Sequence, residues 1–175
     1  RFVLCNMSAE LGAKTGIIAP NARTLASIEA AGGHVPADAL GWRSDDDARF
    51  ERNLTFDATT LQPQVSAPHS PSNSDVVGAL PGVRIDQAYI GACTGAKLED
   101  LHMAAAVLDG HKVAAHVRLL IAPASTRTTQ LAAADGTLAK LTAAGAILLP
   151  TGCGACAGYG AGILAVGKSW IIGCI

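Results

Sequence analysis

The feature that most constrains the fold of this chain is an alternation of short apolar runs and helical segments in its C-terminal half. Three strands are expected, at residues 86–91 (apolar at 88–90), 119–121 and 146–149, and each is stopped by a nearby glycine or proline, as buried strands often are. Helices are expected over residues 98–108, 128–134 and 138–144. Apolar strands that alternate with helices usually pair in parallel and are covered on their faces. The pattern therefore predicts an α/β protein with a mostly parallel sheet.

The N-terminal half is less regular. Helical character is seen over residues 5–12, a short buried strand over 16–19, and a helix over 24–31 with Asn21 as its N-cap. Residues 61–81 form a connector rich in proline and serine. This composition predicts a boundary between two domains, residues 1–82 and 83–175.

Charge and composition exclude several classes of protein. The formal net charge of the 175 residues is −1 and like charges do not run together, so neither a nucleic-acid footprint nor a basic membrane patch is present. No apolar stretch reaches the roughly 18 residues of a membrane-spanning helix, and no secretory signal is visible. Five unevenly spaced cysteines do not suggest a disulfide framework. We therefore expect a cytoplasmic protein that keeps its cysteines for metal binding or chemistry.

Three cysteines share one kind of place in the predicted sheet. Cys93 follows the first strand, and Cys153 and Cys156 form a C-x-x-C after the third. Ligands of open α/β sheets bind beyond the carboxyl ends of the strands, so we expect the two loops to converge there. Three interpretations stay open: a thioredoxin-like redox pair, a structural zinc site, and an iron–sulfur cluster held by three thiolates. Cys5 and Cys174 have no such context and are expected to be small buried hydrophobic residues.

Three segments resemble motifs of the aconitase superfamily, most closely those of the large subunits of 3-isopropylmalate dehydratase and homoaconitase. They are residues 5–20, 90–101 and 150–156, in the family's order. The resemblance implies a three-layer α/β/α sandwich. Residues 1–82 would be the C-terminal part of one aconitase-like domain, and residues 83–175 a cluster-ligating domain that is incomplete at its C-terminus.

The same resemblance implies roles for five residues. Cys93, Cys153 and Cys156 would ligate a [4Fe–4S] cluster, and Asn6 and Glu10 match active-site positions. If residues 5–12 are helical, Asn6 and Glu10 lie on one face, because they are four positions apart. The implied hydro-lyase removes water from a hydroxy di- or tricarboxylate, such as 3-isopropylmalate or homocitrate, and adds it back in the isomeric position. A separate small subunit supplies the serine base in this family.

The chain departs from the family pattern in two places. Gly95 stands where many members have asparagine, and residues 167–175 replace the Asn-Arg stretch that usually follows the second cluster motif. The chain also begins at Arg1 in an apolar segment, which suggests a fragment. We therefore expect that it does not turn over without the missing domains and the small subunit. The alternative is an inactive aconitase-like fragment or cluster-binding module.

Overall fold

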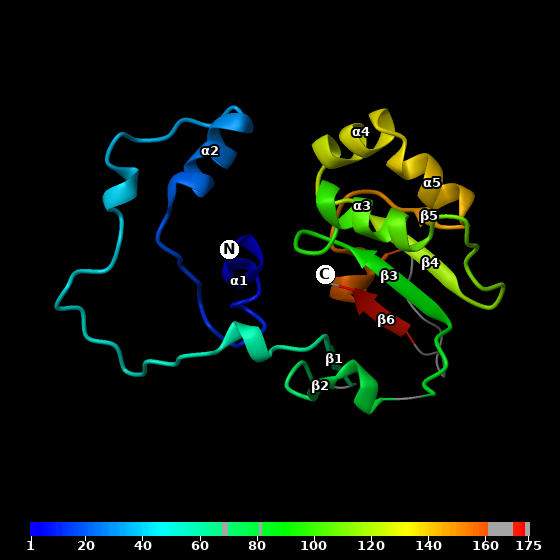
Figure 1. Ribbon diagram of the computed structural model, residues 1–175, viewed down its shortest axis with the longest axis horizontal. Coiled ribbons are helices and arrows are strands. Elements are labelled where there is room, and N and C mark those ends of the chain that lie inside the picture. The colour runs from blue at the N-terminus through cyan, green and yellow to red at the C-terminus, as the bar shows by residue number, and fades with distance from the viewer. Residues whose placement is uncertain (68–69, 81, 161–169, 174–175) are drawn as a thin grey trace. The chain divides into compact units, whose positions relative to one another are not determined.

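The chain folds into two compact units, Arg1–Leu80 and Pro81–Ile175. The computed structural model describes residues 1–67, 70–80, 82–160 and 170–173 (Figure 1). The division falls at the end of the proline- and serine-rich connector. The assignment of the two parts to larger aconitase-like domains stays a prediction.

Short elements joined by long irregular segments make up the N-terminal unit. Asn21 caps α2 as predicted, because its side-chain Oδ1 accepts a hydrogen bond from the Thr24 N–H at 3.0 Å. The strands β1 and β2 form an antiparallel pair with Gln64 opposite Val76. The elements are α1 (Phe2–Asn6), α2 (Ala22–Ala30), η1 (Ala39–Gly41), η2 (Ala58–Thr60), β1 (Gln64–Ser66), β2 (Ser74–Val76) and η3 (Val77–Ala79), η marking a 3-10 helix.

Two expectations for this unit are wrong. Residues 16–19 form no strand, and the side chain of Ile17 is 86% exposed. The helix expected over residues 5–12 lies earlier and ends at Asn6. Both predictions took local apolar spacing as a sign of burial, yet Ala39 is the one buried residue among those described in this unit. An apolar run needs a neighbouring strand or helix to pack against before its local pattern determines structure.

A four-stranded parallel sheet organises the C-terminal unit, with strand order β5-β4-β3-β6. Its three predicted strands and three predicted helices are confirmed, which establishes the α/β class. The fourth strand, β6, pairs with β3 and was not predicted. The elements are β3 (Gln87–Gly91), α3 (Leu98–Val107), β4 (Arg118–Ala122), α4 (Thr126–Ala134), α5 (Thr137–Ala143), β5 (Ile147–Leu148), η4 (Gly154–Ala157) and β6 (Trp170–Gly173).

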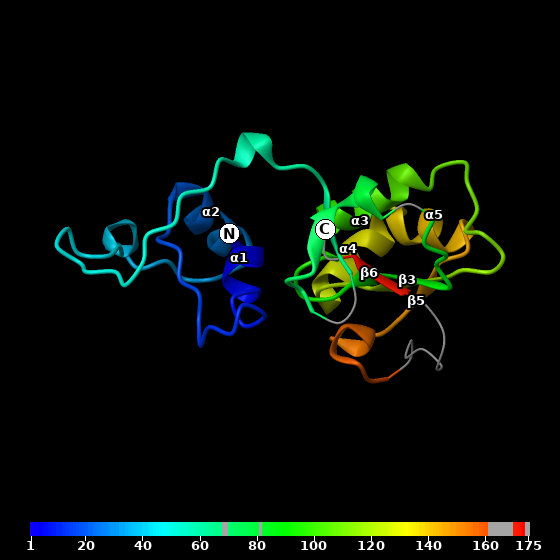
Figure 2. The same ribbon diagram turned by 90° about the horizontal axis from the view of Figure 1, so that it is seen from below.

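The two faces of the sheet are covered differently. On one face, Leu119 and Ile121 of β4 pack with the three helices, whose central contacts include Leu101 and Leu141. On the other face, Leu120 packs with residues of β3 and of the segment that contains η4. Figure 2 shows the three helices on one side of the sheet and this orange segment on the other. The predicted third layer of helices is therefore not found in the described part of the chain.

Within the residues that the structure describes, no helix has both the length and the apolar character needed to cross a bilayer.

Candidate functional site

The first cysteine lies in a tight turn directly after β3. Cys93 is exposed, whereas its neighbours Ala92 and Thr94 are buried at 4% and 6% exposure. The turn is also tied to the next strand connection, because the Ala124 N–H donates to the Ala96 carbonyl at 2.9 Å. The thiol therefore projects from a loop whose backbone is packed into the unit.

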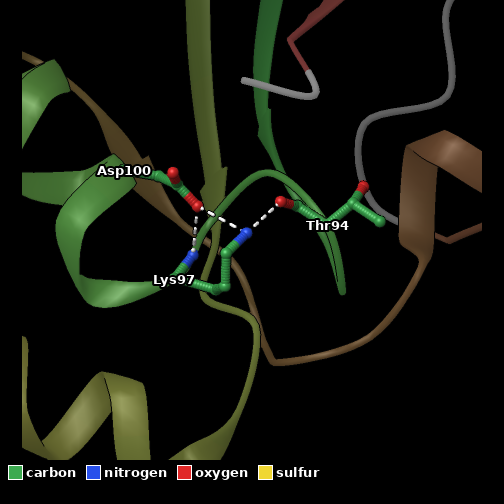
Figure 3. Close-up of polar contacts among 3 residues, drawn as sticks. All are labelled: Thr94, Lys97 and Asp100. Atoms are coloured by element: carbon green, nitrogen blue, oxygen red, sulfur yellow. Dashed lines mark hydrogen bonds and ion pairs between the residues drawn. The ribbon is translucent and has the colours of Figure 1, made fainter. Parts of the chain in front are cut away.

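Lys97 and Asp100 fasten this turn to the start of α3. The Asp100 Oδ2 atom accepts a hydrogen bond from the Lys97 backbone N–H at 2.9 Å and forms an ion pair with Lys97 Nζ, also at 2.9 Å. The same Nζ also donates to the Thr94 carbonyl, as Figure 3 shows. Because Asp100 is only 7% exposed, these charge-assisted hydrogen bonds are shielded from competing water. The clamp fixes the chain between the cysteine and the helix.

The second cysteine loop begins where β5 ends. Its start is tied to β4, because the Leu149 N–H donates to the Ile121 carbonyl at 2.8 Å. Ala155, within η4, is 3% exposed and packs on the sheet face opposite the helices. Cys153 and Cys156, on either side of this buried alanine, are exposed thiols. The C-x-x-C motif is thus anchored by the buried Ala155, and both of its cysteines are exposed.

Tyr89 connects the second loop to β3. Its side chain is 1% exposed, and its hydroxyl donates a hydrogen bond to the Cys153 carbonyl at 3.1 Å. The strand that carries Tyr89 leads directly into the Cys93 turn. The structure therefore brings the two cysteine loops to the carboxyl end of β3, as expected from the sheet topology.

The three thiols do not form a metal centre in this arrangement. Across the described ranges, no group of three or more histidine, cysteine, aspartate or glutamate side chains is placed to hold a metal ion. The donor set nevertheless has the right chemistry for an iron–sulfur cluster, since it consists of three exposed thiols on two anchored loops. The assignment of Cys93, Cys153 and Cys156 as ligands stays a prediction.

Asn6 and Glu10 lie in the N-terminal unit. Asn6 is the last residue of α1 and Glu10 lies in the turns that follow, both of them exposed. They do not share a helix face, contrary to the prediction, because α1 ends at Asn6. Their catalytic roles stay predictions. Cys5, expected to be buried, is half-buried. Cys174 lies outside the described residues.

Three residues that organise the site were missed by the sequence reasoning. Lys97 and Asp100 had a readable signal, because an acidic residue three positions after a helix N-cap is typical of a capping box. Tyr89 had a weaker signal: a tyrosine in a buried strand needs a partner for its hydroxyl. Nothing in the sequence shows that this partner is the Cys153 carbonyl.

An open hollow with a volume of about 520 Å³ lies between α4 and residues 148–151. It reaches the second cysteine motif only at Thr151, and the three cysteines are not part of its lining. The site is therefore defined by the two loops rather than by this hollow.

The chain matches the sequence model of the aconitase family (aconitate hydratase) over residues 1–81 and 75–173. It is 43% identical over 168 residues to 3-isopropylmalate dehydratase large subunit 1 of Methanopyrus kandleri. The match covers 96% of this chain and 40% of that protein. The corresponding protein of Pyrococcus furiosus is 42% identical over 96% of this chain and 39% of its own length. The homoaconitase large subunit of Thermus thermophilus is 40% identical over 96% of this chain and 38% of its own length.

These matches, together with the parallel sheet and its two cysteine loops, show that the chain belongs to the aconitase family. It spans about 40% of the length of the curated relatives that it matches.

Proposed function

We propose that this chain is the cluster-ligating part of the large subunit of an iron–sulfur hydro-lyase that dehydrates and rehydrates a hydroxy di- or tricarboxylate. Its substrate is of the 3-isopropylmalate or homocitrate kind. The observation that carries the proposal is that each cysteine motif follows a strand of one parallel sheet, and that Tyr89 hydrogen-bonds the second loop at Cys153.

In this proposal, Cys93, Cys153 and Cys156 each ligate one iron of a [4Fe–4S] cluster. Held by these three residues, such a cluster would supply a Lewis acid for a substrate hydroxyl and carboxylate. The Lys97–Asp100 clamp holds the first thiol loop and the buried Ala155 holds the second. Asn6 and Glu10 contribute an amide and a carboxylate to the substrate site, and a separate small subunit supplies the catalytic base.

The proposal also includes the architecture around the site and the cellular location. Residues 1–82 and 83–175 are parts of two larger α/β domains, and helices of the whole protein complete a three-layer sandwich. The protein works in the cytoplasm, where thiols are kept reduced.

Anaerobic reconstitution of the 175-residue chain with iron and sulfide tests the cofactor. We expect about four irons per chain and broad absorption near ~400 nm, because thiolate-bound clusters absorb there. Replacing Cys93, Cys153 or Cys156 by serine removes most of the iron and the colour. Cys5→Ser is the matched control and retains both. A colourless protein that binds one zinc ion contradicts the proposal, and so does a loss in Cys5→Ser equal to that in Cys93→Ser.

A second candidate function is a cluster-binding module without turnover. The observation that favours it is Gly95, which stands in the first cysteine motif where many family members have asparagine. Mixing the reconstituted chain with a small subunit of a 3-isopropylmalate dehydratase, and assaying dehydration of isopropylmalate, homocitrate and citrate, separates the two. Turnover in that mixture excludes the module. Iron uptake without turnover favours it.

A further inference from the structure

The phenol group of Tyr89 lies between two glycines, one from each cysteine motif. A Cβ added to Gly91 would lie 2.6 Å from the Tyr89 Cε1 and Cζ atoms and 2.7 Å from its Oη. A Cβ added to Gly154 would lie 3.6 Å from the same Oη. The ring therefore passes directly over Gly91, where a side chain would clash with it, and its hydroxyl ends at van der Waals distance from Gly154.

The ring has little freedom to leave this position. Tyr89 packs with Leu120, Ala122 and Ala155 in one buried cluster and is 1% exposed. A buried tyrosine hydroxyl needs a hydrogen-bond partner, because leaving it unpaired costs free energy. The Cys153 carbonyl is that partner, at 3.1 Å. The Tyr89 hydroxyl therefore links β3 to the second cysteine loop at the backbone of Cys153.

The two glycines that contact Tyr89 are close in sequence to Cys93 and Cys153. Gly91, under the ring, is two residues before Cys93, and Gly154, beside the hydroxyl, is one residue after Cys153. A shift of the Tyr89 ring changes the position of the second loop relative to the end of β3, where the first loop begins.

We propose that Tyr89 is a positioning residue that sets the separation between the Cys93 turn and the Cys153 loop. The inference rests on the proposed function in one respect, which is that both loops serve the same cluster. In this inference Tyr89 acts through its hydrogen bond to the backbone of Cys153.

The first experiment measures the proximity of the loops without any cluster. In the full chain with its other three cysteines replaced by serine, diamide oxidises Cys93 and Cys153 to a disulfide by accepting two electrons and two protons. We expect the disulfide, mapped by mass spectrometry, to form about threefold to tenfold more slowly in Tyr89→Phe, which keeps the ring but loses one neutral hydrogen bond. Tyr159→Phe is the control, because Tyr159 is the other tyrosine of the chain and is 57% exposed.

A structural role alone gives a different result. If Tyr89 only stabilises the fold, the cross-linking rate should fall only when the helical circular dichroism signal or the unfolding midpoint also falls. We expect Tyr89→Phe to change both of these very little. Gly91→Ala provides a second variant, because it keeps the hydroxyl but its new Cβ displaces the ring. We expect it to slow the cross-link at least as much. Equal rates in Tyr89→Phe, Tyr159→Phe and the parent chain overturn the inference, and so does the absence of any Cys93–Cys153 disulfide in the parent.

The second experiment uses the reconstituted chain. We expect a chelator to remove iron several-fold faster from Tyr89→Phe than from Tyr159→Phe, because the ligand loop opens more often. Unchanged iron release overturns the inference. If the parent chain takes up no cluster, the proposed function fails, while the cross-linking rates still report on Tyr89.

Discussion

The two units of the chain differ in where their apolar side chains lie. In the C-terminal unit, buried residues line both faces of the sheet, with Leu101, Ile121 and Leu141 at most 1% exposed. In the N-terminal unit, large apolar side chains such as Leu11 and Phe56 are 87% and 79% exposed. Burial of apolar surface is the main favourable contribution to folding. The difference teaches that the C-terminal unit holds most of the stability of this chain by itself.

The largest expected effect compares two leucines. Leu101→Ala leaves a cavity in the core under the helices, and we expect it to lower the free energy of unfolding by about 2–5 kcal/mol. Leu11→Ala removes the same atoms from an exposed position and should change it by less than about 0.5 kcal/mol. Urea unfolding followed by circular dichroism measures both. Similar losses in the two variants would break the comparison.

A smaller effect compares two helix caps of the same geometry. Ser125 Oγ caps α4 and Asn21 Oδ1 caps α2, each accepting a backbone N–H at 3.0 Å. We expect Ser125→Ala to lower the free energy of unfolding by about 0.5–2 kcal/mol. Asn21→Ala should leave the main transition unchanged, because α2 contributes no buried residue to a core. An equal shift of the urea midpoint in both variants would show that α2 folds cooperatively with the sheet.

The smallest effect concerns two exposed carboxylates at low pH. The Thr137 side chain, His102 and the Thr137 backbone N–H lower the pKa of Asp135 from 3.8 to about 2. Hydrogen bonds from the side chain and backbone of Thr59 also lower the pKa of Asp57. A lowered pKa in the folded state contributes stability above the unfolded value, and this contribution is lost as pH falls through the folded value.

The unfolding midpoint of the C-terminal unit should therefore fall between about pH 4 and pH 2, in part through Asp135. We expect Asp135→Asn to flatten this dependence, and Asp57→Asn to leave it as it is, because Asp57 lies in the sparsely buried unit. Thermal unfolding between pH 2 and pH 5 measures the slopes. A flatter slope in Asp57→Asn alone would reverse the comparison.

The fold of the C-terminal unit could be predicted from the sequence better than that of the N-terminal unit. The strands and helices of the C-terminal unit were predictable, because their apolar runs are bounded by glycine or proline and are buried by one another. The fourth strand was missed, since its pairing with β3 joins residues distant in sequence, such as Gln87 and Trp170. In the N-terminal unit, local spacing around Ile17 predicted burial for which the described residues of the unit offer no partner.

The candidate site divides in a similar way. The alternation of strands and helices predicted that the Cys93 and Cys153 loops both follow the carboxyl ends of strands. In the structure these strands are β3 and β5, which lie on either side of β4. The Lys97–Asp100 clamp was readable from its spacing. The hydrogen bond from Tyr89 to Cys153 was not, because it depends on which face of β3 the ring occupies and on the path of a distant loop across that face.

The loop that carries Cys153 and Cys156 is also the cover of one face of the sheet, through Ala155. The loop therefore covers this face of the sheet and orders the C-x-x-C motif in the same folding step. A species that binds the two thiols of the native state, but not those of the unfolded chain, shifts the folding equilibrium toward the native state. Its binding free energy is then added to the stability of the sheet. Loading of the site and maturation of the fold are thermodynamically one process.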